Sequence, residues 1–175
     1  MEKEDIIKAV IKIFESKGLK FSVLDIATYL KTSKRTIYKF FENKESLLIS
    51  AVDYVFDDIE KQHYEILKTD RDILSKLIDI LLVYPRFVDV QNIEFEESIK
   101  EDENFYRLVK EHLTSKWDLT LSVFEQCKNQ KLIKDIPNSV FREIMLSIYD
   151  SSMTFTNNKE ILRNCVEALF YGLKI

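Results

Sequence analysis

Apolar residues recur along most of this chain at intervals of three and four positions, the spacing that gathers side chains on one face of an α-helix. The first such stretch covers residues 5–17 and stops at Gly18, which suits a helix C-cap. Ser22, Ser33 and Asn43 each stand directly before a further apolar stretch, and all three are preferred N-cap residues. Four helices are therefore predicted at the start of the chain, and the fourth is a long one that runs to about residue 68.

Five more helices are predicted in the rest of the chain. Pro85 ends the first of them, because proline removes a backbone donor and restricts the residue before it. The last two are joined by a short link, which favours antiparallel packing, and Asn157 with Glu160 is the expected capping pair of the final helix. The five predicted stretches are 73–84, 87–93, 103–128, 140–152 and 162–173.

Turn-forming residues are scarce, because the chain contains only two glycines and two prolines. An all-β protein would need many more of them for its repeated tight turns. The hydrophobic share of 46% allows a substantial core. The sequence thus predicts an all-α fold of about nine helices.

Charge is distributed unevenly between the two ends of the chain. Residues 1–50 contain ten Lys and Arg against seven Asp and Glu, a net charge of +3, whereas residues 51–175 contain 16 against 23, a net charge of -7. The overall charge of -4 would argue against binding nucleic acid, but a basic first segment on an acidic remainder suits a protein that approaches DNA with one end.

The third predicted helix separates apolar side chains from hydrogen-bonding ones. Ile37, Phe40 and Phe41 fall on one side, which we expect to face the core. At about 100° per residue, Arg35 and Lys39 point away from that side. Arginine binds guanine through two hydrogen bonds, and lysine reaches guanine or phosphate. Two short helices joined by a tight turn, with this face on the second, are the layout of a helix-turn-helix DNA reader.

Lys44 occupies the first position of the fourth predicted helix, where a cation opposes the helix dipole. A DNA phosphate docked at this helix N-terminus would meet both the backbone amides and the lysine. We therefore interpret Lys44 as a phosphate contact, with a solvated lysine as the alternative.

Residues 5–50 resemble the DNA-binding domain of the tetracycline-repressor (TetR) family of bacterial transcription regulators. Lys31 is a departure from the family pattern, because it stands where the turn usually has glycine. If the backbone there is left-handed, lysine costs roughly 1 kcal/mol relative to glycine; a different turn geometry is the other possibility. The matches at fixed spacing are Phe14 with Gly18, Ser22, Ile26-Ala27, Ser33, Thr36-Ile37-Tyr38, Phe40-Phe41 and Lys44-Glu45.

The resemblance implies a helix-turn-helix DNA-binding domain at residues 1–47 and a helical ligand-binding and dimerisation domain at residues 48–175. It implies a repressor that binds a palindromic double-stranded DNA operator as a homodimer through its last two helices, and that a small, mostly apolar effector releases. The implied DNA contacts are Ser22, Ser33, Lys34, Arg35, Thr36, Tyr38, Lys39 and Lys44.

Aromatic side chains with a few polar tips suit the pocket for such an effector. They also suit a plain core, and this second interpretation stays open for each residue. A regulator of the same fold that is controlled by a protein partner, or that acts without a ligand, is the alternative function. The candidate pocket residues are Phe87, Phe105, His112, Trp117, Phe124 and Tyr149.

Other classes of function lack the residues they need. Two isolated histidines, two cysteines without CxxC spacing and no glycine-rich phosphate loop argue against an enzyme, and no cofactor or metal site is predicted. Cys127 and Cys165 are expected to be reduced core residues. No signal peptide and no apolar run of membrane-spanning length is present, so we expect a soluble cytoplasmic protein without membrane contact.

Overall fold

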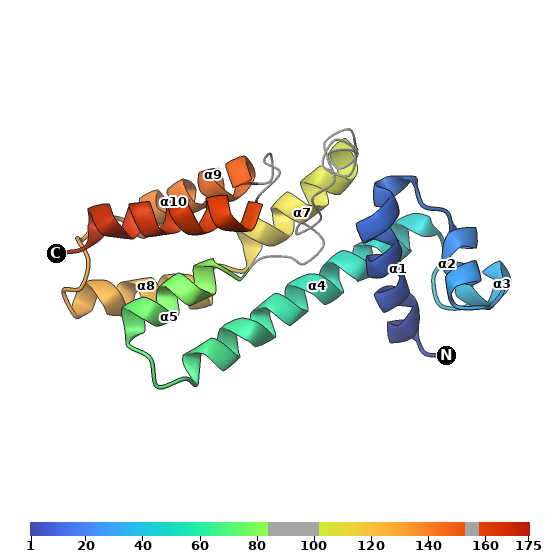
Figure 1. The fold of residues 1–175 in the computed structure, drawn as a ribbon, viewed down its shortest axis with the longest axis horizontal. Helices are drawn as coiled ribbons and strands as arrows, with labels where there is room; N and C mark the ends of the chain where they lie inside the picture. The colour runs from blue at the N-terminus through green and yellow to red at the C-terminus, as the bar shows by residue number, and fades with distance from the viewer. Residues whose placement is uncertain (84–101, 153–157) are drawn as a thin grey trace. The chain divides into compact units, whose positions relative to one another are not determined.

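The computed structural model describes residues 1–83, 102–152 and 158–175. Within these residues the chain forms nine α-helices and one short 3₁₀ turn, η1 (Gly18–Lys20), and contains no β-strand (Figure 1). The predicted all-α fold is confirmed. The helices are α1 (Lys3–Lys17), α2 (Val23–Tyr29), α3 (Lys34–Ile37), α4 (Lys44–Leu67), α5 (Ile73–Leu81), α7 (Glu103–Ser115), α8 (Asp118–Asn129), α9 (Asn138–Ser152) and α10 (Asn158–Leu173).

The predicted caps of the first helices are present. Gly18 is the C-cap of α1, with φ at 55°. Ser22 and Ser33 are the N-caps of α2 and α3. The Asn43 side chain accepts a hydrogen bond from the Ser46 amide at 2.8 Å, directly before α4. Local signals in the sequence thus set where these helices begin and end.

The later helices differ from the prediction at two points. Helix α5 ends at Leu81, three residues earlier than expected. Residues 103–128 form two helices instead of one, with Lys116 and Trp117 between them. At this break the Trp117 indole donates to the Leu113 carbonyl at 2.5 Å. The predictions for Pro85, for residues 87–93 and for Asn157 lie outside the described residues.

Two compact units make up the described chain, and α4 and α7 each contribute to both. The first unit comprises residues 1–58 and the start of α7 up to Lys110. In its core the Phe14 ring lies 6.5 Å from the Phe21 ring and 5.3 Å from the Phe105 ring, measured between centroids. This unit holds the whole of the predicted helix-turn-helix. The predicted domain boundary at residue 47 stays a prediction.

The second unit contains the rest of α4, α5, the end of α7, and α8 to α10. Its core combines aliphatic and aromatic side chains, with the Phe124 and Phe141 rings stacked at 3.9 Å. The buried Tyr149 hydroxyl donates to the Leu81 carbonyl at 3.0 Å, which connects α9 to α5. Helices α9 and α10 pack against each other as an antiparallel hairpin (Figure 1). Among the described helices, none combines the length and apolar character needed to cross a membrane.

Candidate nucleic-acid interface

Helix α2 begins with a reciprocal cap between Ser22 and Asp25. The Ser22 hydroxyl accepts from the Asp25 amide at 3.2 Å, and the Asp25 carboxylate accepts from the Ser22 amide at 2.7 Å. The Lys17 ammonium lies 2.6 Å from the same carboxylate. The hydrogen bond from Lys17, followed by those from Ser22, holds the pKa of Asp25 well below its usual range. These contacts anchor the start of α2 to the end of α1.

The turn between α2 and α3 is left-handed at Lys31, where φ is 51°. The Lys31 amide donates to the Thr28 carbonyl at 3.1 Å, and the Thr32 amide donates to the Ala27 carbonyl at 2.8 Å. These two bonds form a Schellman motif, which satisfies the last carbonyls of α2. The left-handed geometry considered from the sequence is therefore present, and lysine costs about 1 kcal/mol there relative to glycine.

Helix α3 is a single turn held by its first residues. The Ser33 hydroxyl accepts from the Thr36 amide at 3.1 Å and lies 2.9 Å from the Thr36 hydroxyl. Ile37 and Phe41 are buried, as predicted, but Phe40 is 39% exposed, so its predicted place in the core is wrong. Regular helix ends at Ile37, and the 100° spacing that would place Phe40 beside Ile37 does not continue.

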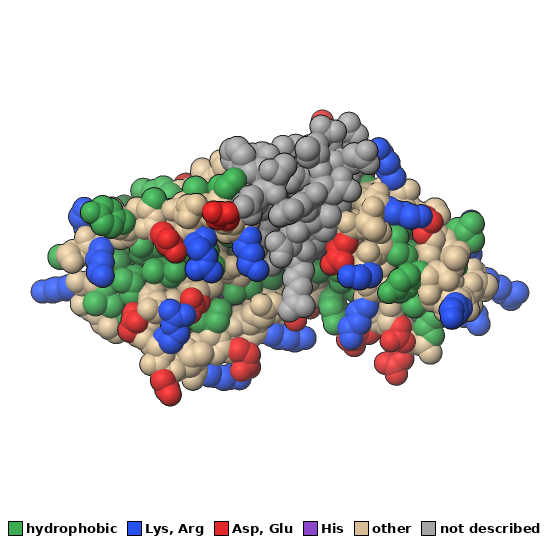
Figure 2. All heavy atoms as spheres, viewed as in Figure 1, with side chains coloured by type: hydrophobic (Ala, Val, Ile, Leu, Met, Phe, Trp, Pro, Cys, Tyr) green, Lys and Arg blue, Asp and Glu red, His purple; other side chains and the backbone are tan. Residues whose placement is uncertain are grey.

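Four cations lie on and beside α3, with no acidic residue between them in sequence: Lys31, Lys34, Arg35 and Lys39. All four are exposed, and no ion pair is recorded for them within residues 1–83, 102–152 and 158–175. Basic side chains project from the end that α3 occupies (Figure 2). This basic surface, defined by the four residues, has the charge that a polyanion requires.

Two exposed apolar residues beside this surface were not predicted as site residues. Leu24 and Tyr29 on α2 are 54% and 57% exposed, and Tyr38, which was predicted, is 48% exposed. The signal was available in the sequence, because the buried stripe of Val23, Ile26 and Ala27 leaves Leu24 and Tyr29 outside it, on its two flanks.

Lys44 lies differently from the four cations of the basic surface. Its ammonium donates to the Leu19 carbonyl at 2.7 Å and lies 4.5 Å from the centroid of the Phe21 ring. Partial burial lowers the pKa of this ammonium, an effect that the Asp102 and Asp25 carboxylates oppose. The predicted phosphate contact by Lys44 stays a prediction.

The candidate pocket residues do not all come together. Trp117, Phe124 and Tyr149 are buried in the core of the second unit. Phe105 lies instead in the core of the first unit, beside Phe14. His112 is half-buried at the end of α7, and Phe87 lies outside the described residues. Their role in binding a ligand stays a prediction.

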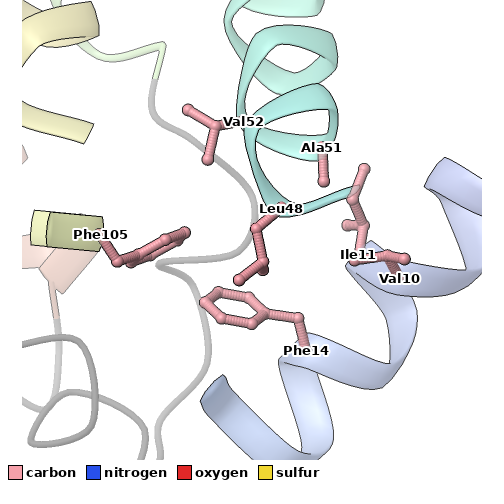
Figure 3. Close-up of a pocket in the computed structure, with 7 residues that line it drawn as sticks. All are labelled: Val10, Ile11, Phe14, Leu48, Ala51, Val52 and Phe105. Carbon is pink, nitrogen blue, oxygen red and sulfur yellow. The ribbon is translucent and has the colours of Figure 1, made fainter. Parts of the chain in front are cut away.

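A small hollow in the first unit lies between α1, the start of α4 and Phe105 (Figure 3). Its volume of about 10 Å³ is at the lower limit for one water molecule. The hollow therefore has no room for an effector. Its lining is Val10, Ile11, Phe14, Leu48, Ala51, Val52 and Phe105.

A larger, shallow depression of about 430 Å³ lies on the α9–α10 hairpin. Cys165 lines it and is half-buried, so the predicted core position of this cysteine is wrong. Cys127 is buried as predicted, and burial raises the pKa of its thiol to about 11. The other lining residues are Glu143, Ile144, Ser147, Ile148 and Ser151.

Comparison with known proteins identifies the first unit. A family model for bacterial regulatory proteins of the tetR family matches residues 6–51. The uncharacterized HTH-type transcriptional regulator YvaF of Bacillus subtilis (strain 168) is 24% identical over 178 residues, which cover 96% of this chain and 93% of YvaF. The resemblance to the TetR family predicted from the sequence is thus confirmed. The TetR transcriptional regulators that it resembles are not enzymes.

Solved structures of TetR-family regulators share the whole fold. A TetR transcription regulator from Haloarcula marismortui superposes with a TM-score of 0.75 at 18% identity, covering 99% of this chain and 98% of the other. The transcriptional regulator FadR from Bacillus subtilis, in complex with stearoyl-CoA, gives a TM-score of 0.69 at 17% identity and covers 98% and 100% of the two chains. The similarity of fold extends over both units of this chain.

Proposed function

We propose that this TetR-family regulator is a repressor that binds a palindromic DNA operator as a homodimer in the cytoplasm and is released by a small, mostly apolar ligand. The basic surface on and beside α3 is the observation that carries the proposal. Its four exposed cations lie on or beside α3, and Ser22 and Ser33 cap the two helices of the helix-turn-helix.

The small size of α3, the proposed DNA-reading helix, supports a homodimer. Helix α3 spans four residues and offers too few base contacts for specific binding on its own. Two copies about 34–36 Å apart would reach successive major grooves of a palindrome. The outer face of the α9–α10 hairpin, with its shallow depression, is the proposed contact between the two copies.

The proposed effector is a small, mostly apolar molecule, and stearoyl-CoA, which joins an apolar acyl chain to a charged coenzyme A group, is a first probe for it. The similar fold of FadR, which was solved with stearoyl-CoA, supports this choice of first probe. The ligand would release DNA only to the extent that it binds the released state more tightly than the DNA-bound state.

A second candidate is a regulator of the same fold that a protein partner controls or that needs no ligand. The packing of the second unit favours it, because the Phe124 and Phe141 rings stack at 3.9 Å and the Trp117 and Phe141 rings are 6.3 Å apart. A ligand that bound between these rings would have to separate them.

The DNA-binding proposal is tested by selecting bound sequences from a pool of random duplexes. We expect an inverted repeat whose half-sites are centred about one helical turn, or a multiple of it, apart. Lys39→Ala should then lower the affinity and reduce the slope of log K against log salt by about 0.9 per lost contact. Lys61→Ala, at an exposed residue of α4 in the second unit, is the matched control. Selection that yields no repeat, together with an unchanged slope, would contradict the proposal.

The ligand proposal is tested separately with stearoyl-CoA. Under the proposal this probe raises the melting temperature and lowers the affinity for the selected operator. If neither changes, acyl-CoA is not the effector, and a screen of other apolar compounds that also leaves operator binding unaltered would favour the second candidate.

A further inference from the structure

The ammonium of Lys44 points into the protein. Lys44 is the first residue of α4 and lies in the same unit as Leu19 and Phe21. Nζ donates to the Leu19 carbonyl at 2.7 Å and lies 4.5 Å above the Phe21 ring, a distance at which the ring face attracts a cation. This cation therefore has protein partners in the absence of DNA.

The Leu19 carbonyl belongs to η1, the turn that follows α1. Carbonyls at the end of a helical segment lack a partner inside that segment and need one from elsewhere. Lys44 supplies that partner from 25 positions along the chain. The adjacent Phe21 ring is buried, so Lys44 contacts the connection between α1 and α2 on both sides of Lys20.

The same connection sets where α2 begins. Ser22 follows Phe21 directly and is the N-cap of α2, where it exchanges hydrogen bonds with Asp25. Helix α2 in turn packs against α3. A shift of the connection would therefore move α2, and with it the helix that carries Lys34 and Arg35.

We infer that Lys44 is a positioning residue for DNA reading, which holds the α1–α2 connection against the start of α4 and thereby orients α2 and α3. The inference rests on the proposed DNA-binding function and assigns Lys44 a role different from the phosphate contact implied by its position in the sequence. Partial burial, which lowers the pKa of the ammonium, agrees with a cation that the protein covers in part.

The test is Lys44→Met, which retains an apolar stem over Phe21 and removes the ammonium. We expect the affinity for the selected operator to fall about tenfold or more, because a hydrogen bond from a charged donor is lost. The slope of log K against log salt should stay the same, since no phosphate contact is removed. A slope smaller by about 0.9 per lost contact would overturn the inference. A lower melting temperature with unchanged operator affinity would also overturn it, because the role would then be purely structural.

Two companion variants separate this inference from the proposed function. Lys39→Met should reduce the salt slope, and Lys61→Met should change neither slope nor affinity. If Lys39→Met and Lys44→Met both reduce the slope, the inference about Lys44 fails while the proposed function stands. If Lys39→Met leaves the slope unchanged as well, the proposed DNA surface itself fails, and the inference fails with it.

A measurement on the unaltered protein covers the case in which Lys44→Met does not fold. In protein labelled with ¹⁵N-lysine, the Lys44 ammonium signal, assigned with Lys44→Arg, should keep its chemical shift when operator DNA is added. The Lys39 ammonium signal should move. A shift of the Lys44 signal as large as that of Lys39 would overturn the inference.

Discussion

Lys31 and Lys131 adopt the same left-handed backbone, with φ at 51° and 56°, at the ends of α2 and α8. In each turn the lysine amide donates to the carbonyl three residues back, at 3.1 Å for Lys31 and 2.8 Å for Lys131. The following amide donates to the carbonyl five residues back in both turns. The first turn contributes Lys31 to the basic surface, and the other lies in the second unit.

Lys31→Gly and Lys131→Gly should each raise the free energy of unfolding by about 1 kcal/mol, because glycine adopts positive φ without a steric cost. Urea denaturation of the two variants measures the change. Lys131→Gly should leave operator affinity unaltered and so serves as the control for any effect of Lys31→Gly on DNA. Destabilisation by either glycine would contradict the strain assigned to that turn.

Asp25→Asn should weaken the protein at neutral pH and reduce its loss of stability in acid. The pKa of Asp25 is lowered in the folded state, so its carboxylate stabilises the fold above the unfolded pKa of about 3.9, and that contribution is lost as pH falls below this value. Melting temperatures between pH 7 and pH 2 measure the effect. Glu42→Gln, at an exposed carboxylate of the same unit, is the control. Equal acid sensitivity of Asp25→Asn and the unaltered protein would count against the capping role.

Tyr149→Phe should lower the free energy of unfolding by about 1–2 kcal/mol, because it leaves the Leu81 carbonyl without its buried donor. Chemical denaturation followed by circular dichroism measures the loss. Tyr171→Phe removes the same hydroxyl from a side chain that is 91% exposed and should have almost no effect. If the two variants lose the same stability, the hydrogen bond to Leu81 is not the cause.

The Phe124→Ala variant tests whether Phe124 is a core residue or lines a ligand pocket. Phe124 is fully buried and stacks on Phe141, so its truncation should cost about 3–5 kcal/mol. The free energy of unfolding, measured in urea without ligand, gives the cost. A loss below 1 kcal/mol would show that the ring borders open space, as the ligand-pocket interpretation requires.

Features set by neighbouring residues were predictable from the sequence. Ser22 and Ser33 cap helices through bonds to residues three positions away, and Gly18 ends α1 through its own backbone freedom. The break after α7 was not predictable from periodicity, because Trp117 continues the apolar spacing of Leu113 across it. A hydrophobic stripe shows which residues share a face but not whether the helix beneath them is continuous.

Long-range contacts account for two further differences between the prediction and the structure, at Lys44 and Phe105. The Leu19 carbonyl that Lys44 contacts is 25 positions away in the sequence. Phe105 packs on Phe14 although the two are also far apart in the sequence, so neither contact leaves a local pattern. Phe40 was misplaced because α3 ends sooner than its apolar residues suggest. The candidate DNA contacts lie on one short segment, so a sequence pattern can propose them, whereas a pocket would have to be assembled from several helices that no local pattern brings together.

The chain contains one tryptophan, and its surroundings make it an intrinsic fluorescent reporter of the second unit. Trp117 is buried, with the Phe141 and Tyr149 rings each 6.3 Å away. Its emission should shift to the red when this core opens, while unfolding confined to the first unit leaves it unaltered. Tryptophan emission and far-ultraviolet circular dichroism recorded on one sample would therefore report whether the two units unfold together or in sequence.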